Sequence, residues 1–232
     1  MTGSPTRPDL SALSDEDLVK RIQALLKNHK GPKRPGASKN PLIDSHFQEI
    51  YTRYQKKIEY YCSRFVYDRD ALTDNYHDIF LKIYLNLHRY HYTKSFKAWI
   101  YKIAHNSCIN YVRKTRHQDL TVLNRQVAGK DNQAREFIEL CESGEIDIED
   151  QLVRKELRDA IEGSVDALPF QHRNVYMLKT VAHLTFEEIA KIEKISSRSV
   201  KTLFHNSLVF IKERLDQQGF NLGDLKIKRE EP

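Results

Sequence analysis

The segment from 184 to 215 most strongly limits how this chain can fold, because it holds the start signals of two helices separated by a very short turn. Thr185 and Glu188 have the spacing of a capping box, in which each side chain satisfies a free backbone N–H in the first turn of a helix. Ser196 offers an N-cap for a second, longer helix only a few residues later. Two helices joined by so short a turn must cross steeply.

The second of these predicted helices is amphipathic. Its apolar side chains recur at about 100° per residue, while Arg198, Thr202 and His205 point away from them, flanked by Lys201 and Asn206. Such a helix, supported by a shorter one, is what a helix-turn-helix places in the major groove of DNA, where these side chains reach base edges and phosphates. An ordinary helical hairpin with a solvated face has the same pattern, and the pattern alone favours neither.

Composition narrows the class of protein. The chain has 232 residues, of which 40% are hydrophobic and 30% charged, as in a soluble globular protein of one large or two small domains. No apolar run approaches the roughly 20 residues of a membrane span, and the N-terminus lacks a signal peptide, so we expect a cytoplasmic protein without membrane insertion. The net charge of +6 favours a polyanionic partner.

The small number of cysteine, glycine and proline residues carries further information. Three widely spaced cysteines predict reduced thiols, and Cys62 and Cys108 lie beside apolar helical positions where a small core residue fits. Eight glycines and seven prolines predict a mainly helical chain. We find no P-loop, HExxH, GxSxG or catalytic Cys/His spacing, and His88 with His91 is too small a set of ligands for a metal site, so neither catalysis nor a cofactor is predicted.

Helical periodicity in apolar residues recurs in four segments of the first half of the chain. These segments are 14–29, 43–66, 71–87 and 95–117. The basic stretch 27–41 combines Gly, Pro and cations without periodicity, which predicts a flexible loop that either touches phosphate or is simply solvated.

A second basic stretch, from 88 to 95, is unusually aromatic. Cations interleaved with aromatic rings suit single-stranded nucleic acid, since bases stack on the rings while the cations hold the backbone. Tyr90 and Tyr92 lie in this predicted loop and are expected to be exposed. Trp99 and Tyr101 lie on the next helix, where core positions are the more frequent location for such residues.

Three stretches together resemble the extracytoplasmic-function class of bacterial sigma factors. They are DNYHDIFLKIY from Asp74, FKAWIYKIAHNSCINYVRK from Phe96, and ALPFQHRNVYMLKTVAHLTFEEIAKIEKISSRSVKTLFHNSL from Ala167, in the order and spacing of that family. The resemblance implies an all-α fold of two small helical domains, sigma region 2 and sigma region 4 with its helix-turn-helix, joined by a flexible linker. It also implies a subunit that binds core RNA polymerase and directs promoter-specific transcription initiation, and it decides for the helix-turn-helix over the hairpin.

Composition and the resemblance together predict how the chain is divided. The parts are a disordered N-terminus at 1–13, region 2 at 14–118 with a basic insertion at 27–41, a linker at 119–151, region 4 at 152–217, and a polar tail at 218–232. The second half of the linker is acidic. In the family the linker runs toward the active-site cleft of the polymerase, where acids would replace nucleic acid; a solvated spacer or a self-inhibitory contact with the basic faces of the protein are the other interpretations.

Residues in three groups match functional positions of the family. Those that sit where the family docks on the clamp of core RNA polymerase are Asp74, His77, Asp78, Phe80 and Lys82. Those that sit where the family melts and reads the minus-10 element, by holding flipped-out bases of the parted strand, are Arg89, Tyr90, Tyr92, Lys94, Asn106, Asn110 and Arg113. Those that sit where it reads the minus-35 element as duplex DNA are Ser197, Arg198, Ser199, Lys201, Thr202, His205 and Asn206.

Four residues depart from the family pattern. His77 replaces a usual Gln of the clamp helix, and Leu203 and Asn206 replace commonly basic residues of the recognition helix, which predicts a weaker grip on phosphate. Lys194 replaces the usual Gly of the turn, where a left-handed conformation costs a non-Gly residue about 1 kcal/mol.

The family also implies an inhibitory anti-sigma protein as partner. A stand-alone DNA-binding regulator is the rival function, and the match to the clamp helix speaks against it.

Overall fold

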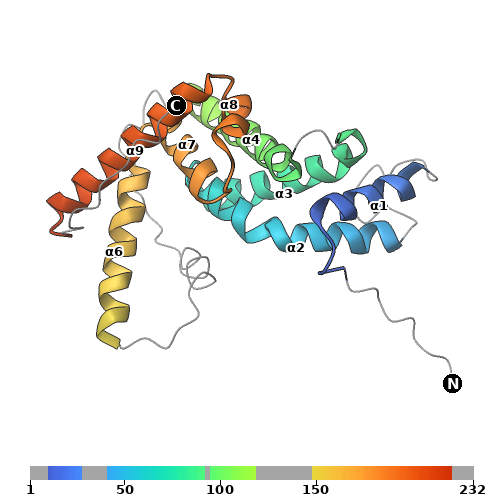
Figure 1. Cartoon of the computed structure of the whole chain (residues 1–232), viewed down its shortest axis with the longest axis horizontal. Helices are drawn as coiled ribbons and strands as arrows, with labels where there is room; N and C mark the ends of the chain where they lie inside the picture. Colours follow the sequence, from blue (N-terminus) through green and yellow to red (C-terminus); the bar gives the residue numbers. More distant parts are fainter. Residues whose placement is uncertain (1–9, 28–40, 92–94, 119–147, 221–232) are drawn as a thin grey trace. The chain divides into compact units, whose positions relative to one another are not determined.

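The computed structural model describes residues 10–27, 41–91, 95–118 and 148–220. These residues form helices and contain no strand (Figure 1), as the all-α prediction requires. The chain divides into two compact units, residues 1–128 and 129–232. Several predicted features lie outside the described residues. They are residues 1–9 of the N-terminus predicted to be disordered, most of the basic insertion and of the acidic linker, residues 221–232 of the polar tail, Tyr92, Lys94 and Cys141.

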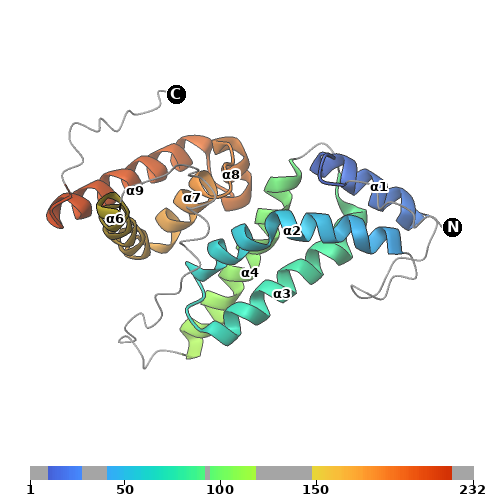
Figure 2. The ribbon, with the colours of Figure 1, turned by 90° about the horizontal axis from the view of Figure 1, so that it is seen from below.

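The described residues of the first unit form four α-helices and one short 3-10 turn. They are α1 (Asp15–Lys27), α2 (Pro41–Ser63), α3 (Arg69–Asn86), η1 (Leu87–Arg89) and α4 (Phe96–Gln118). Short polar side chains mark helix starts, since Ser14 accepts from the N–H of Asp17 at 3.1 Å and Asp68 accepts from that of Ala71 at 2.8 Å. Helices α2, α3 and α4 pack side by side (Figure 2).

Branched aliphatic and aromatic side chains fill the core of this unit. The fully buried ones include Ile50, Ile58, Ile79, Ile83 and Ile100. Tyr61 of α2 and Tyr101 of α4 meet edge to face, with their ring centroids 5.6 Å apart. Cys62 and Cys108 are buried free thiols, as predicted, and their Sγ atoms lie 3.6 Å apart. Tyr101 is therefore core as expected, whereas Trp99 is only half-buried.

Polar contacts attach α1 to α2. The carboxylate of Asp15 accepts hydrogen bonds from Nη1 of Arg53, at 2.8 Å, and from the hydroxyl of Tyr54. Burial and this neighbouring carboxylate raise the pKa of Tyr54. Arg53 also donates to the carbonyl oxygen of Leu10 at 3.1 Å, so the chain before α1 is held against α2 as well.

The second unit contains the remaining helices of the described residues. They are α6 (Ile148–Asp166), α7 (Phe170–Thr180), α8 (Phe186–Glu193) and α9 (Ser197–Gln217). Arg173 donates to the carbonyl oxygens of Asp166 and Leu168, which fixes the turn between α6 and α7. Ser207 of α9 is fully buried and donates to the carbonyl oxygen of His172 on α7 at 3.3 Å.

A buried polar pair joins α7 to the end of α8. Asn174 is fully buried, and its Nδ2 donates to a carboxylate oxygen of Glu193. Burial raises the pKa of Glu193 to about 7, because an ionised carboxylate loses solvation there. This pair lies directly before the turn between α8 and α9 and holds the end of α8 against α7.

Candidate functional site

The turn between α8 and α9 has the geometry predicted from its sequence. The side chain of Thr185 accepts from the N–H of Glu188 at 3.2 Å, and Glu188 Oε2 accepts from the N–H of Thr185 at 2.8 Å, which completes the capping box. Lys194 adopts the left-handed conformation, with φ 60° and ψ 41°. Ser196 then caps α9 by accepting from the N–H of Ser199 at 3.0 Å. Each of these three predictions is confirmed.

The first turns of α9 present two kinds of polar residue. Arg198, Ser199 and Thr202 are exposed. Ser197 and Lys201 are instead half-buried against α8. Ser197 donates to a carboxylate oxygen of Glu187 at 3.2 Å, and Lys201 Nζ lies 5.9 Å from the ring centre of Phe186.

Glu187 is an acidic residue beside this polar face. Its own backbone N–H and the Ser197 hydroxyl hold the pKa of Glu187 below its usual value. The exposed tip of α9 therefore offers one guanidinium and two hydroxyls, which is a set of groups suited to base edges and phosphates.

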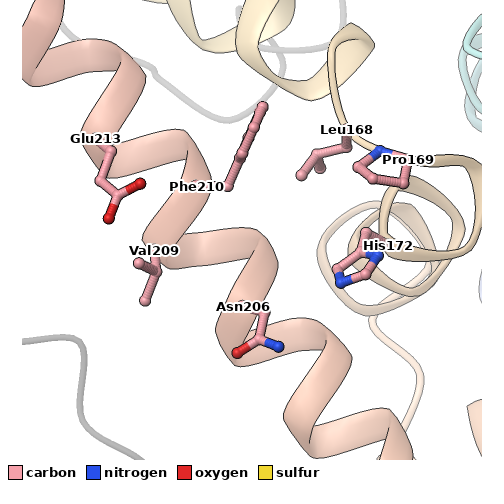
Figure 3. Close-up of a pocket in the computed structure, with 7 residues that line it drawn as sticks. All are labelled: Leu168, Pro169, His172, Asn206, Val209, Phe210 and Glu213. Carbon is pink, nitrogen blue, oxygen red and sulfur yellow. The ribbon is translucent and has the colours of Figure 1, made fainter.

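The two remaining candidates on α9 lie farther along the helix. His205 is half-buried. Asn206 is exposed and lines a groove of about 330 Å³ between α9 and the start of α7 (Figure 3). The groove is lined by Leu168, Pro169, His172, Asn206, Val209, Phe210 and Glu213. The sequence interpretation missed this groove, whose apolar wall includes Phe210.

A second polar face lies on α3. Asp74, His77 and Asp78 are exposed together on one side of this helix. Lys82 is exposed too, and its Nζ lies 3.9 Å from an Asp78 carboxylate oxygen and donates to Ser107 Oγ of α4 at 3.3 Å. The structure thus brings three candidates together as an acidic surface, and Lys82 also links α3 to α4.

Phe80 does not share that exposed surface. It is 5% exposed, and its ring packs against that of Tyr51 of α2, with centroids 4.7 Å apart. Both rings lie beside a groove of about 380 Å³ between α2 and α3. The groove is lined by Asp44, Phe47, Gln48, Tyr51, Tyr76, His77, Phe80, Leu81 and Tyr84. The contribution of α2 was missed, although Phe47 and Tyr51 at i and i+4 were a signal for an aromatic face.

Further exposed polar candidates lie on η1 and on α4. Arg89 is exposed in η1, and Asn106, Asn110 and Arg113 are exposed on α4 at spacings of four and three residues, which places them on one side of the helix. Within the described residues, no group of three or more His, Cys, Asp or Glu side chains could hold a metal ion.

The expectation that Tyr90 is exposed is wrong. Tyr90 is 3% exposed, because its ring is enclosed by α4: it meets Phe96 edge to face at 5.2 Å and Trp99 at 5.6 Å. The rings that cover Tyr90 belong to α4. That these rings fold over the loop could not be predicted from the residues next to Tyr90 in the sequence. Tyr90 therefore anchors the loop at its first end.

Comparisons with known proteins assign both units to one family. The family model "Sigma-70 region 2" matches residues 50–118, and "Sigma-70, region 4" matches residues 158–211. The ECF RNA polymerase sigma-E factor of Escherichia coli (strain K12) is 30% identical over 185 residues, which cover 78% of this chain and 83% of that protein. The chain belongs to the extracytoplasmic-function (ECF) family of RNA polymerase sigma factors.

A further relative and a solved structure are also similar to this sigma factor. The ECF RNA polymerase sigma factor SigW of Bacillus subtilis is 28% identical over 169 residues, or 73% of this chain and 88% of that protein. The solved structure of CnrH in complex with the cytosolic domain of CnrY matches with a TM-score of 0.55 and 14% identity, covering 88% of this chain and 97% of that one. At this identity the structural match shows the fold.

Membership of the family establishes the general function. This sigma factor is a binding subunit rather than an enzyme: it associates with core RNA polymerase and promoter DNA and directs promoter-specific transcription initiation. Among the described residues, no helix is both long enough and apolar enough to cross a membrane. Helix α1 lies outside the residues that the region 2 model matches.

Proposed function

We propose that the two units divide the promoter between them, so that region 2 melts and reads the minus-10 element and region 4 reads the minus-35 element as duplex. One observation carries this proposal: the polar face of η1 and α4 and that of α9 belong to separate compact units, each with its own buried core. Each face can therefore bind DNA without rearrangement of the other.

The face of η1 and α4 suits a parted strand. Asn106 and Asn110 each offer two donors and an acceptor to the edges of unpaired bases, and Arg89 and Arg113 offer charge to the backbone. Drawing a base out of the stack costs a few kcal/mol, which such contacts offset. Because Tyr90 is buried, we assign it to holding this face in place rather than to stacking on a base.

The tip of α9 suits the major groove of duplex DNA. Arg198 is exposed in the first turn, where a recognition helix contacts bases, and Ser199 and Thr202 are exposed beside it. One good bidentate contact from an arginine contributes about 1–3 kcal/mol of discrimination between bases. Lys201 and Ser197 are held by α8, so we assign them to orientation of α9 and to phosphate contact.

The acidic surface of α3 suits the polymerase. Asp74 and Asp78 are exposed on the same side of α3, next to the aromatic groove that His77 also lines. A partner helix with cationic and apolar side chains could place its cations against the carboxylates and its apolar side chains in the groove. We propose that this partner is the clamp of core RNA polymerase.

An inhibitory protein partner is the further part of this proposal. CnrH, whose solved structure shares this fold, was solved in complex with the cytosolic domain of CnrY. Both units carry a partly apolar groove that another helix could fill. We place the protein in the cytoplasm beside its polymerase. Affinity purification of the full-length protein from its own cells should recover an inhibitor as well as polymerase, and recovery of polymerase subunits alone would contradict the inhibitor.

Two substitutions test the division of roles. Asp78→Lys should abolish promoter-specific transcription by reversing a charge on the polymerase-facing surface, with at least about a tenfold loss of core affinity for a like-charge contact of a few kcal/mol. Arg198→Ala should leave core binding unchanged and weaken recognition of the minus-35 element. Core association is measured by co-elution and titration, and transcription from a promoter with an intact or a scrambled minus-35 element.

Each of the two assignments, of α3 to polymerase binding and of α9 to the minus-35 element, has an outcome that would refute it. Equal affinity of the Asp78→Lys variant and the wild type for core polymerase would refute the assignment of α3. Unchanged preference of the Arg198→Ala holoenzyme for the intact minus-35 element would refute that of α9.

A further inference from the structure

The side-chain amide of Gln23 joins α1 to the turn that follows α3. Its Nε2 donates to the carbonyl oxygens of Leu87 and Tyr90, both at 2.9 Å. Leu87 begins η1 and Tyr90 caps its end, and the N–H of Tyr90 donates to the same Leu87 oxygen at 3.2 Å. Because a primary amide has two N–H donors, one side chain holds both ends of the turn.

The turn that Gln23 holds is part of the proposed minus-10 face. Arg89 lies between the two acceptor residues and is exposed. Tyr90 follows it, with its ring packed on Phe96 and Trp99 at the start of α4. The backbone of the turn is therefore fixed from α1 while its end is fixed from α4, and a shift of the amide would move the guanidinium of Arg89 relative to the polar side of α4.

We infer that Gln23 is a positioning residue for capture of the unpaired minus-10 strand, and that α1 belongs to the promoter-opening apparatus although it lies outside the matched residues 50–118. The inference rests on the proposed function, since it takes region 2 to hold the parted strand. Groups that select a ligand must be held within about 0.5 Å of their productive geometry. A three-residue 3-10 turn has poor hydrogen-bond geometry of its own, so it needs such external support.

Three variants separate hydrogen bonding from side-chain bulk. Gln23→Met keeps the length of the side chain and removes both donors. Gln23→Lys keeps donors on a side chain of similar reach, so it should still hold the two carbonyl oxygens. Gln55→Met makes the same chemical replacement at a half-buried residue of α2 and is the matched control.

The measurement is the selectivity of the holoenzyme for a single strand. Each full-length variant is assembled with core RNA polymerase, and its affinity for a fluorescent strand with the minus-10 sequence of its promoter is divided by that for a scrambled strand. This ratio does not depend on the fraction of active protein, so a loss of stability alone leaves it unchanged. We expect it to fall by about tenfold in Gln23→Met, the effect of losing two hydrogen bonds of ordinary strength. It should stay at the wild-type value in Gln55→Met and be largely restored in Gln23→Lys.

Two results would overturn the inference. One is a Gln23→Met holoenzyme that keeps the wild-type ratio, and the other is a Gln23→Lys holoenzyme as unselective as Gln23→Met. A wild-type holoenzyme that does not distinguish the two strands would instead overturn the proposed function of region 2, which keeps the two failures apart. The fluorescence of Trp99, the single tryptophan of the chain, reports whether each variant of the first unit is folded.

Discussion

The helix-turn-helix of region 4 and the proposed minus-10 face of region 2 are held in place by different kinds of contact. Thr185, Glu188 and Ser196 fix the starts of α8 and α9 through hydrogen bonds that span three residues. In region 2, η1 is fixed by Gln23, more than sixty residues earlier in the chain, and by aromatic rings of α4. The comparison shows that the helix starts of one proposed promoter-binding face are fixed by local capping, whereas the turn of the other is fixed by tertiary contacts.

The largest difference should appear when one buried aromatic ring is removed from region 2. Tyr90→Ala leaves a cavity between Phe96 and Trp99, and truncation of a large buried aromatic residue lowers the free energy of unfolding by about 3–5 kcal/mol. Urea denaturation followed by the fluorescence of Trp99 measures this loss in the first unit alone. Tyr67→Ala, at a tyrosine that is 55% exposed, is the control and should change the same quantity by less than about 0.5 kcal/mol. Equal effects of the two substitutions would show that packing of Tyr90 does not support this face.

A smaller effect is expected when a local cap is removed from region 4. Thr185→Ala removes one acceptor of the capping box and should lower the free energy of unfolding of the second unit by about 1 kcal/mol. Far-UV circular dichroism records the unfolding of both units, so the part of its transition that Trp99 does not follow belongs to region 4. Thr185→Ser keeps the hydroxyl and should retain most of the stability. A Thr185→Ala variant that shifts the Trp99 transition instead would contradict the independence of the two units.

A third effect depends on pH and concerns Glu193. With its pKa raised to about 7 from an ordinary value of 4.5, this carboxyl binds more protons in the folded than in the unfolded chain between those two values. The stability of region 4 should therefore fall as pH rises from about 4.5 to about 7 and then level off. Glu193→Gln stays neutral and can still accept from Asn174, so it should remove this decline.

The matched control for that experiment is Glu213→Gln, at an exposed position of α9. It should keep the wild-type dependence of stability on pH. A Glu193→Gln variant with the same decline as the wild type would show that another group causes it.

The same contrast explains what could be predicted from the sequence. The caps of α8 and α9 and the left-handed turn at Lys194 were predictable, because each depends on residue types a few positions apart. The helices of the first unit and α9 followed from apolar periodicity, to within a few residues at their ends, whereas α6 and α7 were implied only by the family resemblance. The burial of Tyr90 was not predictable, because the rings that enclose it and the amide of Gln23 come from other elements.

The candidate sites were predictable only in part, for the same reason. The exposure of Asp74, Asp78 and Arg198 followed from their places opposite apolar stripes. The link between Lys82 and Ser107, and the groove that α2 forms with α3, required the packing of helices that periodicity alone does not arrange. Which residues bind polymerase or DNA stays a prediction that rests on family resemblance and on these surfaces.

One measurement tests the central claim that the polymerase makes the two faces act together. The affinity of the isolated full-length protein for a fluorescent duplex promoter is compared with that of the holoenzyme at physiological salt, each against a scrambled duplex. Two small domains without a fixed spacing gain little from binding both elements at once, whereas a fixed spacing raises affinity by about 10² to 10⁴. We predict weak, unselective binding by the isolated protein and tight, selective binding by the holoenzyme. Nanomolar, sequence-specific binding of the duplex by the isolated protein would contradict the account.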